Sequence, residues 1–223
     1  MSTKYTRILQ MELPQGQSTF LWGARKTGKS SFLKQHYPDS IYYDLLKTDE
    51  YFRLLKEPDL LRKEILAAEI EDLQKPIIID EVQKIPPLLD EVHWLIENSE
   101  AYFILCGSSA RKLKRDGANL LGGRAKDLKL HPLTQEELGA HFKIQQACQF
   151  GTLPKIAQRL VEQDIEEAKS LLRSYITTYI KEEIQAEALT RRHSRGHLRS
   201  AWSWQVSPGR LPQDGWRARG GAL

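Results

Sequence analysis

Apolar residues alternate along the chain between short continuous runs and longer runs of helical spacing. Short apolar runs are typical of parallel strands that are buried on both faces. We expect such strands at residues 18–22, 40–44, 76–81 and 101–106, and an alternating edge strand at residues 127–130. Helical spacing predicts helices at residues 31–36, 59–73 and 85–96. This alternation predicts an α/β fold with a parallel sheet flanked by helices.

The pattern becomes wholly helical after the last expected strand. Thr134 and Glu137 have the spacing of a capping box that begins a helix. From about Cys148 the apolar residues keep helical spacing, with a turn at residues 151–154 and a long amphipathic pattern over residues 165–189. We therefore expect a core over residues 1–147, a helical segment over residues 148–192 and a separate tail over residues 193–223.

The tail accounts for the whole formal net charge of the chain, which is +4. It carries five arginines, one acid, three of the five tryptophans and five of the 14 glycines, without an apolar period. Such a segment cannot bury a core, so we expect it to be disordered and interpret it as a shifted reading frame or a truncated gene product. The alternative is a natural tail that binds nucleic acid or a membrane surface. The remaining body is neutral and gives no support for a nucleic-acid-binding face.

The overall composition is that of an ordinary globular protein, with 40% hydrophobic and 28% charged residues. The sequence contains no apolar run long enough to span a membrane, and its first residues lack the apolar core of a signal peptide. Cys106 and Cys148 do not have metal-ligand spacing, and Cys106 lies in an apolar run where we expect it to be buried. These features predict a cytoplasmic protein without a membrane span.

One motif stands out at the end of the first expected strand. Residues 23–30 match the phosphate-binding pattern G-x-x-x-x-G-K-[S/T], the Walker A motif, without a mismatch. Gly23 and Gly28 allow positive φ, so the backbone amides that follow can converge on a phosphate at the start of the next helix. Lys29 would reach the β- and γ-phosphates, and the Ser30 hydroxyl would bind Mg²⁺. The expected nucleotide contacts are Gly23, Ala24, Arg25, Lys26, Thr27, Gly28, Lys29, Ser30 and Ser31. The alternative is a glycine turn that matches the pattern by chance.

Two carboxylates end the third expected strand. Asp80 and Glu81 end the aliphatic run, at the carboxyl edge where open α/β sheets bind ligands. We expect Asp80 to hold Mg²⁺ through its water shell, as in a Walker B motif. We expect Glu81 to orient and deprotonate the attacking water. The alternative is an acidic turn after a core strand.

The fourth expected strand leads into Gly107, Ser108, Ser109, Ala110 and Arg111. Ser108 or Ser109 could read the γ-phosphate of a nucleotide from this position. Capping of a following helix is an equally good explanation for either serine alone. The basic side chains at residues 111–115 are spaced to straddle a helix, which is most often a solvated face.

Together these motifs resemble a group of bacterial and archaeal AAA+ ATPases that carry a C-terminal domain of unknown function. The matching segments keep the order of that group; they are residues 22–25, 79–86, 107–113, 117–124, 131–138 and 175–184. The resemblance implies a P-loop NTPase sheet of strand order 5-1-4-3-2 and a γ-phosphate sensor at Ser108 or Ser109. It also implies a finger arginine acting between copies of the chain, for which Arg111 and Arg124 are the candidates. The chain departs from the group after Arg192, where a further domain would follow.

The sequence therefore predicts Mg²⁺-dependent binding and hydrolysis of ATP, with a homo-oligomer as the assembly in which a finger arginine would act. The alternative is a nucleotide-binding switch or scaffold with little turnover, because the tail does not match the C-terminal domain. A GTPase is disfavoured, since Asp80 does not begin Asp-x-x-Gly and no Asn-Lys-x-Asp follows. A small-molecule kinase stays open but has no visible acceptor pocket, and a DNA-acting motor would need a basic path.

Overall fold

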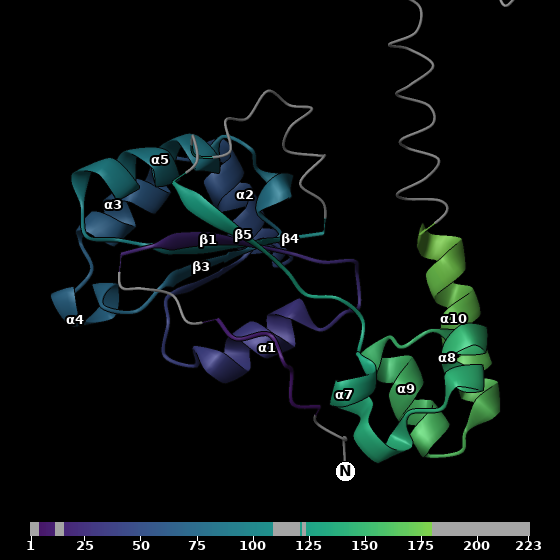
Figure 1. The fold of residues 1–223 in the computed structure, drawn as a ribbon. Coiled ribbons are helices and arrows are strands. Elements are labelled where there is room, and N and C mark those ends of the chain that lie inside the picture. The colour runs from purple at the N-terminus through teal and green to yellow at the C-terminus, as the bar shows by residue number, and fades with distance from the viewer. Residues whose placement is uncertain (1–4, 12–15, 109–120, 122–123, 180–223) are drawn as a thin grey trace, which may run out of the picture. The chain divides into compact units, whose positions relative to one another are not determined.

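The computed structural model of the protein describes residues 5–11, 16–108, 121 and 124–179. Five parallel strands form one sheet (Figure 1): β1 (Ser18–Trp22), β2 (Tyr42–Asp44), β3 (Ile77–Asp80), β4 (Phe103–Gly107) and β5 (Ala125–Lys129). Their order is β2-β3-β4-β1-β5, which is the expected 5-1-4-3-2 order read from the other edge. The predicted α/β fold with a parallel sheet is confirmed.

Helices cover both faces of this sheet (Figure 1). α1 (Lys29–His36) lies on one face, and α2 (Thr48–Lys56), α3 (Leu60–Leu66) and α5 (Leu88–Asn98) lie on the other. Successive strand residues point to opposite faces, so a strand between two helical layers needs an apolar residue at every position. The cluster on the α1 side contains Leu21, Ile78 and Ile104. The cluster on the α3 and α5 side contains Phe20, Ile79 and Leu105.

The single helix predicted over residues 59–73 is wrong. The structure has α3 and then the short α4 (Ile70–Leu73), separated by residues 67–69. Leu61 and Ile65 are buried, but Ile70, which has the same helical spacing, is 75% exposed. The chain must turn back to begin β3 a few residues after α4, and this tertiary requirement overrides helical propensity. α2 was not predicted.

The chain after β5 is helical, with α7 (Gln135–Leu138), η3 (Gly139–His141), α8 (Ile144–Phe150), α9 (Pro154–Val161) and α10 (Ile165–Tyr179). The predicted capping box is confirmed, because the Glu137 amide donates to the Thr134 hydroxyl at 3.2 Å and the Thr134 amide donates to the Glu137 carboxylate at 3.0 Å. The chain divides into two compact units, Met1–Arg173 and Ser174–Leu223. The boundaries expected near residues 147 and 192 stay predictions, and the tail lies outside the described residues.

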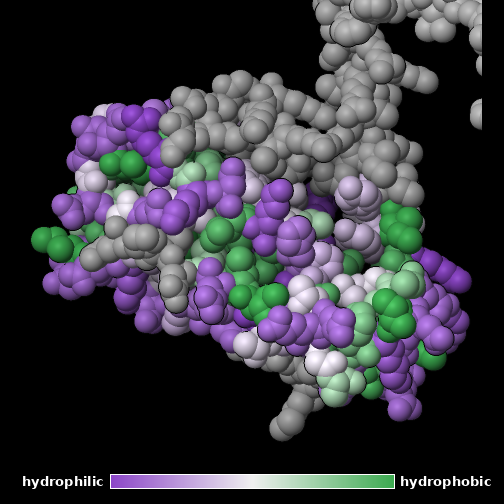
Figure 2. Space-filling model, in the orientation of Figure 1, coloured by the Kyte–Doolittle hydropathy of each residue, from purple (hydrophilic) through white to green (hydrophobic). Residues whose placement is uncertain are grey.

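Hydrophilic residues cover most of the described surface on the side seen in Figure 2, where apolar residues form separate patches. Among the described helices, none combines the length and the apolar character needed to cross a membrane. Cys106 is buried in β4, as expected, and Cys148 is exposed on α8. The buried thiol lies beside the end of β3, because Cys106 pairs with Asp80 in the sheet register.

Candidate phosphate-binding site

The phosphate-binding motif forms the turn between β1 and α1, at the carboxyl edge of the sheet. Gly28 has a φ of +93°, a left-handed conformation that favours glycine, as expected. Gly23 does not have positive φ. Glycine is required there because a Cβ would lie 2.4 Å from the Leu130 carbonyl oxygen. Lys26 is the other left-handed residue of the loop, with a φ of +64°.

Lys29 lies at the start of α1 and folds back onto its own loop. Its Nζ donates to the carbonyl oxygens of Gly23 and Ala24, at 2.7 and 3.1 Å. The Thr27 hydroxyl donates to the same Ala24 carbonyl at 2.8 Å. Only 6% of Lys29 is exposed, so backbone carbonyl dipoles hold its ammonium group within the loop. The loop is thus closed by side chains of its own motif.

Asp80, at the end of β3, meets the first turn of α1. The Ser30 hydroxyl and the Tyr42 phenol both donate to Asp80 Oδ2, at 2.5 and 2.7 Å. Asp80 Oδ1 is buried and has no hydrogen-bond partner among the described residues. Leaving such an oxygen unpaired is unfavourable, so this carboxylate can accept a further partner. The structure brings the two expected Mg²⁺ ligands into direct contact.

Tyr42 and Cys106 are neutral groups on either side of this carboxylate. Burial raises the pKa of the Tyr42 phenol, and the nearby Asp80 carboxylate raises it further. Burial also raises the pKa of the Cys106 thiol well above its ordinary value, and Asp80 adds to the effect. Both groups therefore stay protonated near neutral pH.

Glu81 follows Asp80 in a left-handed conformation, with a φ of +61°. The short helix η1 (Val82–Lys84) begins directly after it. Gln83 Nε2 donates to Glu81 Oε2 and lies 3.4 Å from Ser108 Oγ, so this amide connects the ends of β3 and β4. Gly107 makes room for the amide, since a Cβ there would lie 2.5 Å from Gln83 Oε1. Gln83 was not expected as a site residue, although it belongs to the matching segment 79–86, and it lies between the expected base and the expected sensor.

These elements enclose a cleft of about 350 Å³, called the phosphate cleft below. Its lining residues are Arg25, Lys26, Gly28, Lys29, Ser30, Ser31, Leu46 and Glu81. Six of these eight belong to the expected nucleotide contacts, and Glu81 joins them from the end of β3. Gly23, Ala24 and Thr27 shape the loop through the contacts described above. The structure therefore gathers the phosphate motif and the expected base around one cavity.

The expected finger residue Arg124 lies at the amino ends of the strands, whereas the phosphate loop lies at their carboxyl ends. It directly precedes β5, whose first residue pairs with Ser18, whereas the phosphate loop begins after Trp22. The two ends of the strands are about 13 Å apart, because four residues of strand rise by about 3.3 Å each. Arg124 Nη2 donates to Glu97 Oε1 at 2.6 Å on the surface. Arg124 therefore does not reach the cleft of its own chain.

Two further expected site residues, Ser109 and Arg111, lie outside the described residues. Their assignments as a γ-phosphate sensor and a finger arginine stay predictions. Ser108 lies beside Gln83, and it is the sensor candidate whose position the structure describes.

A second hollow, of about 450 Å³, adjoins the phosphate cleft, because Gly28 and Ser31 line both. We call it the base pocket, for the nucleobase that we propose to lie there. Its other lining residues are Tyr5, Thr6, Arg7, Thr27, Phe32, Gln35, His36, Leu133, Pro154, Lys155 and Gln158. The Tyr5 hydroxyl is buried and has no hydrogen-bond partner among the described residues. Apart from the motif residues, none of these side chains was predicted to meet a ligand. They come from segments far apart in the chain and share no motif.

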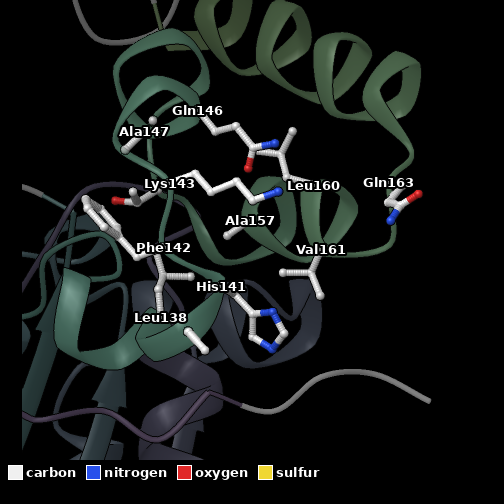
Figure 3. A pocket seen from close by; sticks show the side chains of 13 residues that line it. Leu138, His141, Phe142, Lys143, Gln146, Ala147, Ala157, Leu160, Val161 and Gln163 are labelled. Carbon is white, nitrogen blue, oxygen red and sulfur yellow. The ribbon is translucent and has the colours of Figure 1, made fainter.

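A third and smaller hollow, of about 210 Å³, lies in the helical region after β5 (Figure 3). Lys143 and Gln146 extend toward Leu160 of α9 across this hollow. None of its lining residues is acidic, and none belongs to the phosphate motif. It is separate from the phosphate cleft and the base pocket.

Comparison with known proteins shows the family of the chain. A search of curated proteins found no match. Among solved structures, a Walker-type ATPase of Pyrococcus abyssi is 17% identical with a TM-score of 0.48, and the match covers 79% of this chain and 71% of that one. A family model described as an AAA domain matches residues 15–139, more than half of the chain. The match ends before the helical segment at residues 148–192, whose relation to a C-terminal domain stays a prediction. Because the family match spans the phosphate loop and both carboxylates, the chain belongs to the AAA domain family of P-loop ATPases.

Proposed function

We propose that the chain binds ATP with Mg²⁺ and hydrolyses the β–γ phosphoanhydride bond. The observation that carries this proposal is the hydrogen bond between Ser30 and Asp80, which joins the phosphate loop to the acidic end of β3. Lys29 and Glu81 line the same cleft. Phosphoryl transfer depends on positioning and charge neutralisation, for which a metal-binding corner, a lysine and a base are the recurring parts. Family membership supports the ATPase class, and these contacts support the individual roles.

Mg²⁺ fits the oxygen donors at this corner of the cleft. The Ser30 hydroxyl would bind the ion, and Asp80 would hold it through its water shell. No group of three or more His, Cys, Asp or Glu side chains suited to a metal occurs in the described part of the chain. That is consistent with Mg²⁺, which keeps several waters and takes other ligands from substrate phosphates. When bound, the ion would neutralise charge on the β- and γ-phosphates.

The remaining side chains would handle the proton and the developing charge. Glu81 would accept a proton from the attacking water as the water oxygen bonds to the γ-phosphorus, and the bridging oxygen would leave with ADP. Lys29 would exchange the Gly23 and Ala24 carbonyl oxygens for phosphate oxygens. Ser108, connected to Glu81 through Gln83, would sense the γ-phosphate.

The nucleobase would lie in the base pocket. A nucleotide whose phosphates occupy the cleft reaches this pocket across Gly28 and Ser31, which line both hollows. Tyr5 and Pro154 offer ring faces for packing against a base. The buried Tyr5 hydroxyl, without a partner among the described residues, could bond to a polar edge of the base.

A nucleotide-binding switch with little turnover is the second candidate. The Glu81 carboxylate accepts a hydrogen bond from Gln83, and Arg124 lies at the amino ends of the strands, away from the cleft. A finger arginine contributes about 10³- to 10⁵-fold to turnover in related mechanisms. Because Arg124 does not reach the cleft of its own chain, bound ATP would be hydrolysed slowly, unless a second copy supplied Arg124 or Arg111 acted as the finger.

Single-turnover hydrolysis, measured beside equilibrium ATP binding, separates these two candidates. An ATPase converts bound ATP to ADP and phosphate, at a rate that depends on Mg²⁺. A switch binds ATP with comparable affinity and leaves it intact. Failure of the chain to bind ATP would contradict both.

A further inference from the structure

Arg7 lies in the segment of residues 5–11 before β1, called the N-terminal arm below. It contacts three other segments of the chain, and the proposed hydrolysis does not use it. Its Nη1 donates to the Thr27 carbonyl oxygen of the phosphate loop at 2.8 Å. Its Nη2 donates to the His131 carbonyl oxygen at 2.5 Å, and its Nε donates to Glu137 Oε1 at 2.9 Å. Every nitrogen of this guanidinium therefore has a partner, and one of the partners is the phosphate loop itself.

The two partners outside the loop hold the guanidinium in a fixed direction. The side chains of Arg7 and Glu137 are buried, with 9% and 2% of their surfaces exposed. Glu137 Oε1 also accepts the Ile8 amide at 2.9 Å, and Oε2 accepts the Thr134 amide of the capping box at 3.0 Å. Since a guanidinium is planar and its N–H groups form a rigid fork, two fixed bonds determine where the third one points. The direction of Nη1 is thus set by His131 and α7.

The bond to Thr27 determines the orientation of one peptide group in the phosphate loop. In a planar trans peptide the carbonyl oxygen and the following N–H point in opposite directions. The described chain contains no cis peptide bond, so the Gly28 N–H points away from Arg7. Glycine accepts either sign of φ, and the Thr27–Gly28 peptide could otherwise turn over at low energetic cost. A reversed peptide would present an oxygen, not an N–H, to an anion in the cleft.

We propose that Arg7 is a positioning residue, which holds the Thr27–Gly28 peptide with its N–H toward a bound phosphate and connects this orientation to Glu137 of α7. The proposal rests on the proposed function, because that function supplies the phosphate. A displacement of α7 would be transmitted to the phosphate loop through Arg7. Arg7 would thereby couple the helical region after β5 to nucleotide affinity.

The test compares two variants that both lack the Glu137 carboxylate, and the double variant also removes Arg7, since an unpaired buried charge would destabilise the fold. Glu137→Gln keeps Arg7 and retains an acceptor oxygen for it. Arg7→Met combined with Glu137→Gln removes the bond to Thr27 together with both charges. Arg159→Met, which breaks an exposed pair with Glu162, is the control for the loss of an arginine. The probes are ADP and adenosine, measured by calorimetry.

We expect ADP affinity to fall by about tenfold or more from Glu137→Gln to the double variant, the size expected for one hydrogen bond to a charged group. Adenosine affinity should fall less, because adenosine lacks the phosphates. Hydrogen exchange in residues 23–32 of the nucleotide-free protein should become faster in the double variant only.

Equal ADP affinities in the two variants, or equal losses for ADP and adenosine, would overturn the role of Arg7 in the loop. Unchanged hydrogen exchange would also overturn it. If the wild-type chain bound no ADP, the proposed function would fail. The exchange comparison would still decide whether Arg7 orders the loop.

Discussion

The phosphate cleft and the base pocket share Gly28 and Ser31, yet they are built from different chemical groups. The cleft presents charges and hydroxyls, namely Lys29, Ser30 and Glu81, with Asp80 bonded to Ser30. The base pocket presents ring faces such as Tyr5 and Pro154 beside basic and amide side chains such as Lys155 and Gln158, and no carboxylate is among its described lining residues. Charges aimed at reacting atoms act mainly in the transition state, whereas ring faces bind substrate and transition state alike. The comparison predicts that the cleft governs turnover and the binding of the phosphates, and that the base pocket governs the binding of the nucleobase.

The largest effect is expected from Glu81→Gln, on the turnover side of this comparison. The amide keeps the shape of the carboxylate but cannot accept the proton of the attacking water. We expect kcat to fall about 10²- to 10⁴-fold, with ATP affinity unchanged. Hydrolysis and ATP binding measured on the same preparation check this, and Glu136→Gln, at an exposed position of α7, is the control. Turnover equal to that of the wild type would remove Glu81 from the chemistry.

Lys29→Met should separate phosphate binding from base binding. The substitution removes the ammonium that would pair with the phosphates but keeps most of the aliphatic volume. We expect ATP affinity to fall about 10- to 100-fold, the range for a hydrogen bond between charged groups, while adenosine affinity stays the same. Competition binding measures both, with Lys126→Met on the exposed face of β5 as the control. A matching loss for adenosine would show that the variant disturbs the base pocket as well.

Tyr5→Leu should act on affinity alone. Loss of a ring face typically weakens binding by about 0.5–1.5 kcal/mol, which corresponds to about 2- to 10-fold. We expect this loss for both ATP and adenosine, with kcat unchanged at saturating ATP. Pyrophosphate, which has no base, should bind as it does to the wild type. A fall in kcat without a change in affinity would contradict the assignment of the base to this pocket.

The smallest effect is expected at Glu137, which connects the arm and α7. Burial would raise the pKa of Glu137, but the Ile8 amide, the Arg7 guanidinium and the Thr134 amide outweigh it, and the pKa is lowered from its ordinary value of 4.5. A carboxylate with a lowered pKa stabilises the fold above its unfolded pKa and loses that contribution as the pH falls through the folded value. As the pH falls below 4.5, the thermal unfolding temperature should therefore decrease more steeply in the wild type than in Glu137→Gln. Parallel pH curves for the two proteins would contradict this.

The phosphate cleft could be predicted from the sequence because its geometry is local. Gly28, Lys29 and Ser30 are consecutive residues at a strand-to-helix turn, and their positions follow from that turn. Asp80 and Glu81 follow an aliphatic strand, and parallel strands end at the same edge of a sheet. The strand order came from the resemblance to a family, because the lengths of the elements alone do not specify it.

The base pocket could not be predicted, because its walls are brought together only by tertiary packing. Tyr5, Phe32 and Pro154 have no common spacing or motif. Gly23 shows the same limit: the residue was identified correctly, but the reason for it is the close approach of Leu130, which is remote in sequence. Ile70 kept helical spacing and still proved exposed, since the pattern does not reveal where the chain must turn back to the sheet.

The most direct test of the central claim is a crystal structure with Mg²⁺ and an ATP analogue that carries a β–γ imido bridge. The account predicts the β-phosphate inside the loop of residues 23–30, the ion beside Ser30 and Asp80, and the base next to Tyr5 and Pro154. Phosphates bound away from Lys29, or an ion bound away from both Ser30 and Asp80, would contradict it.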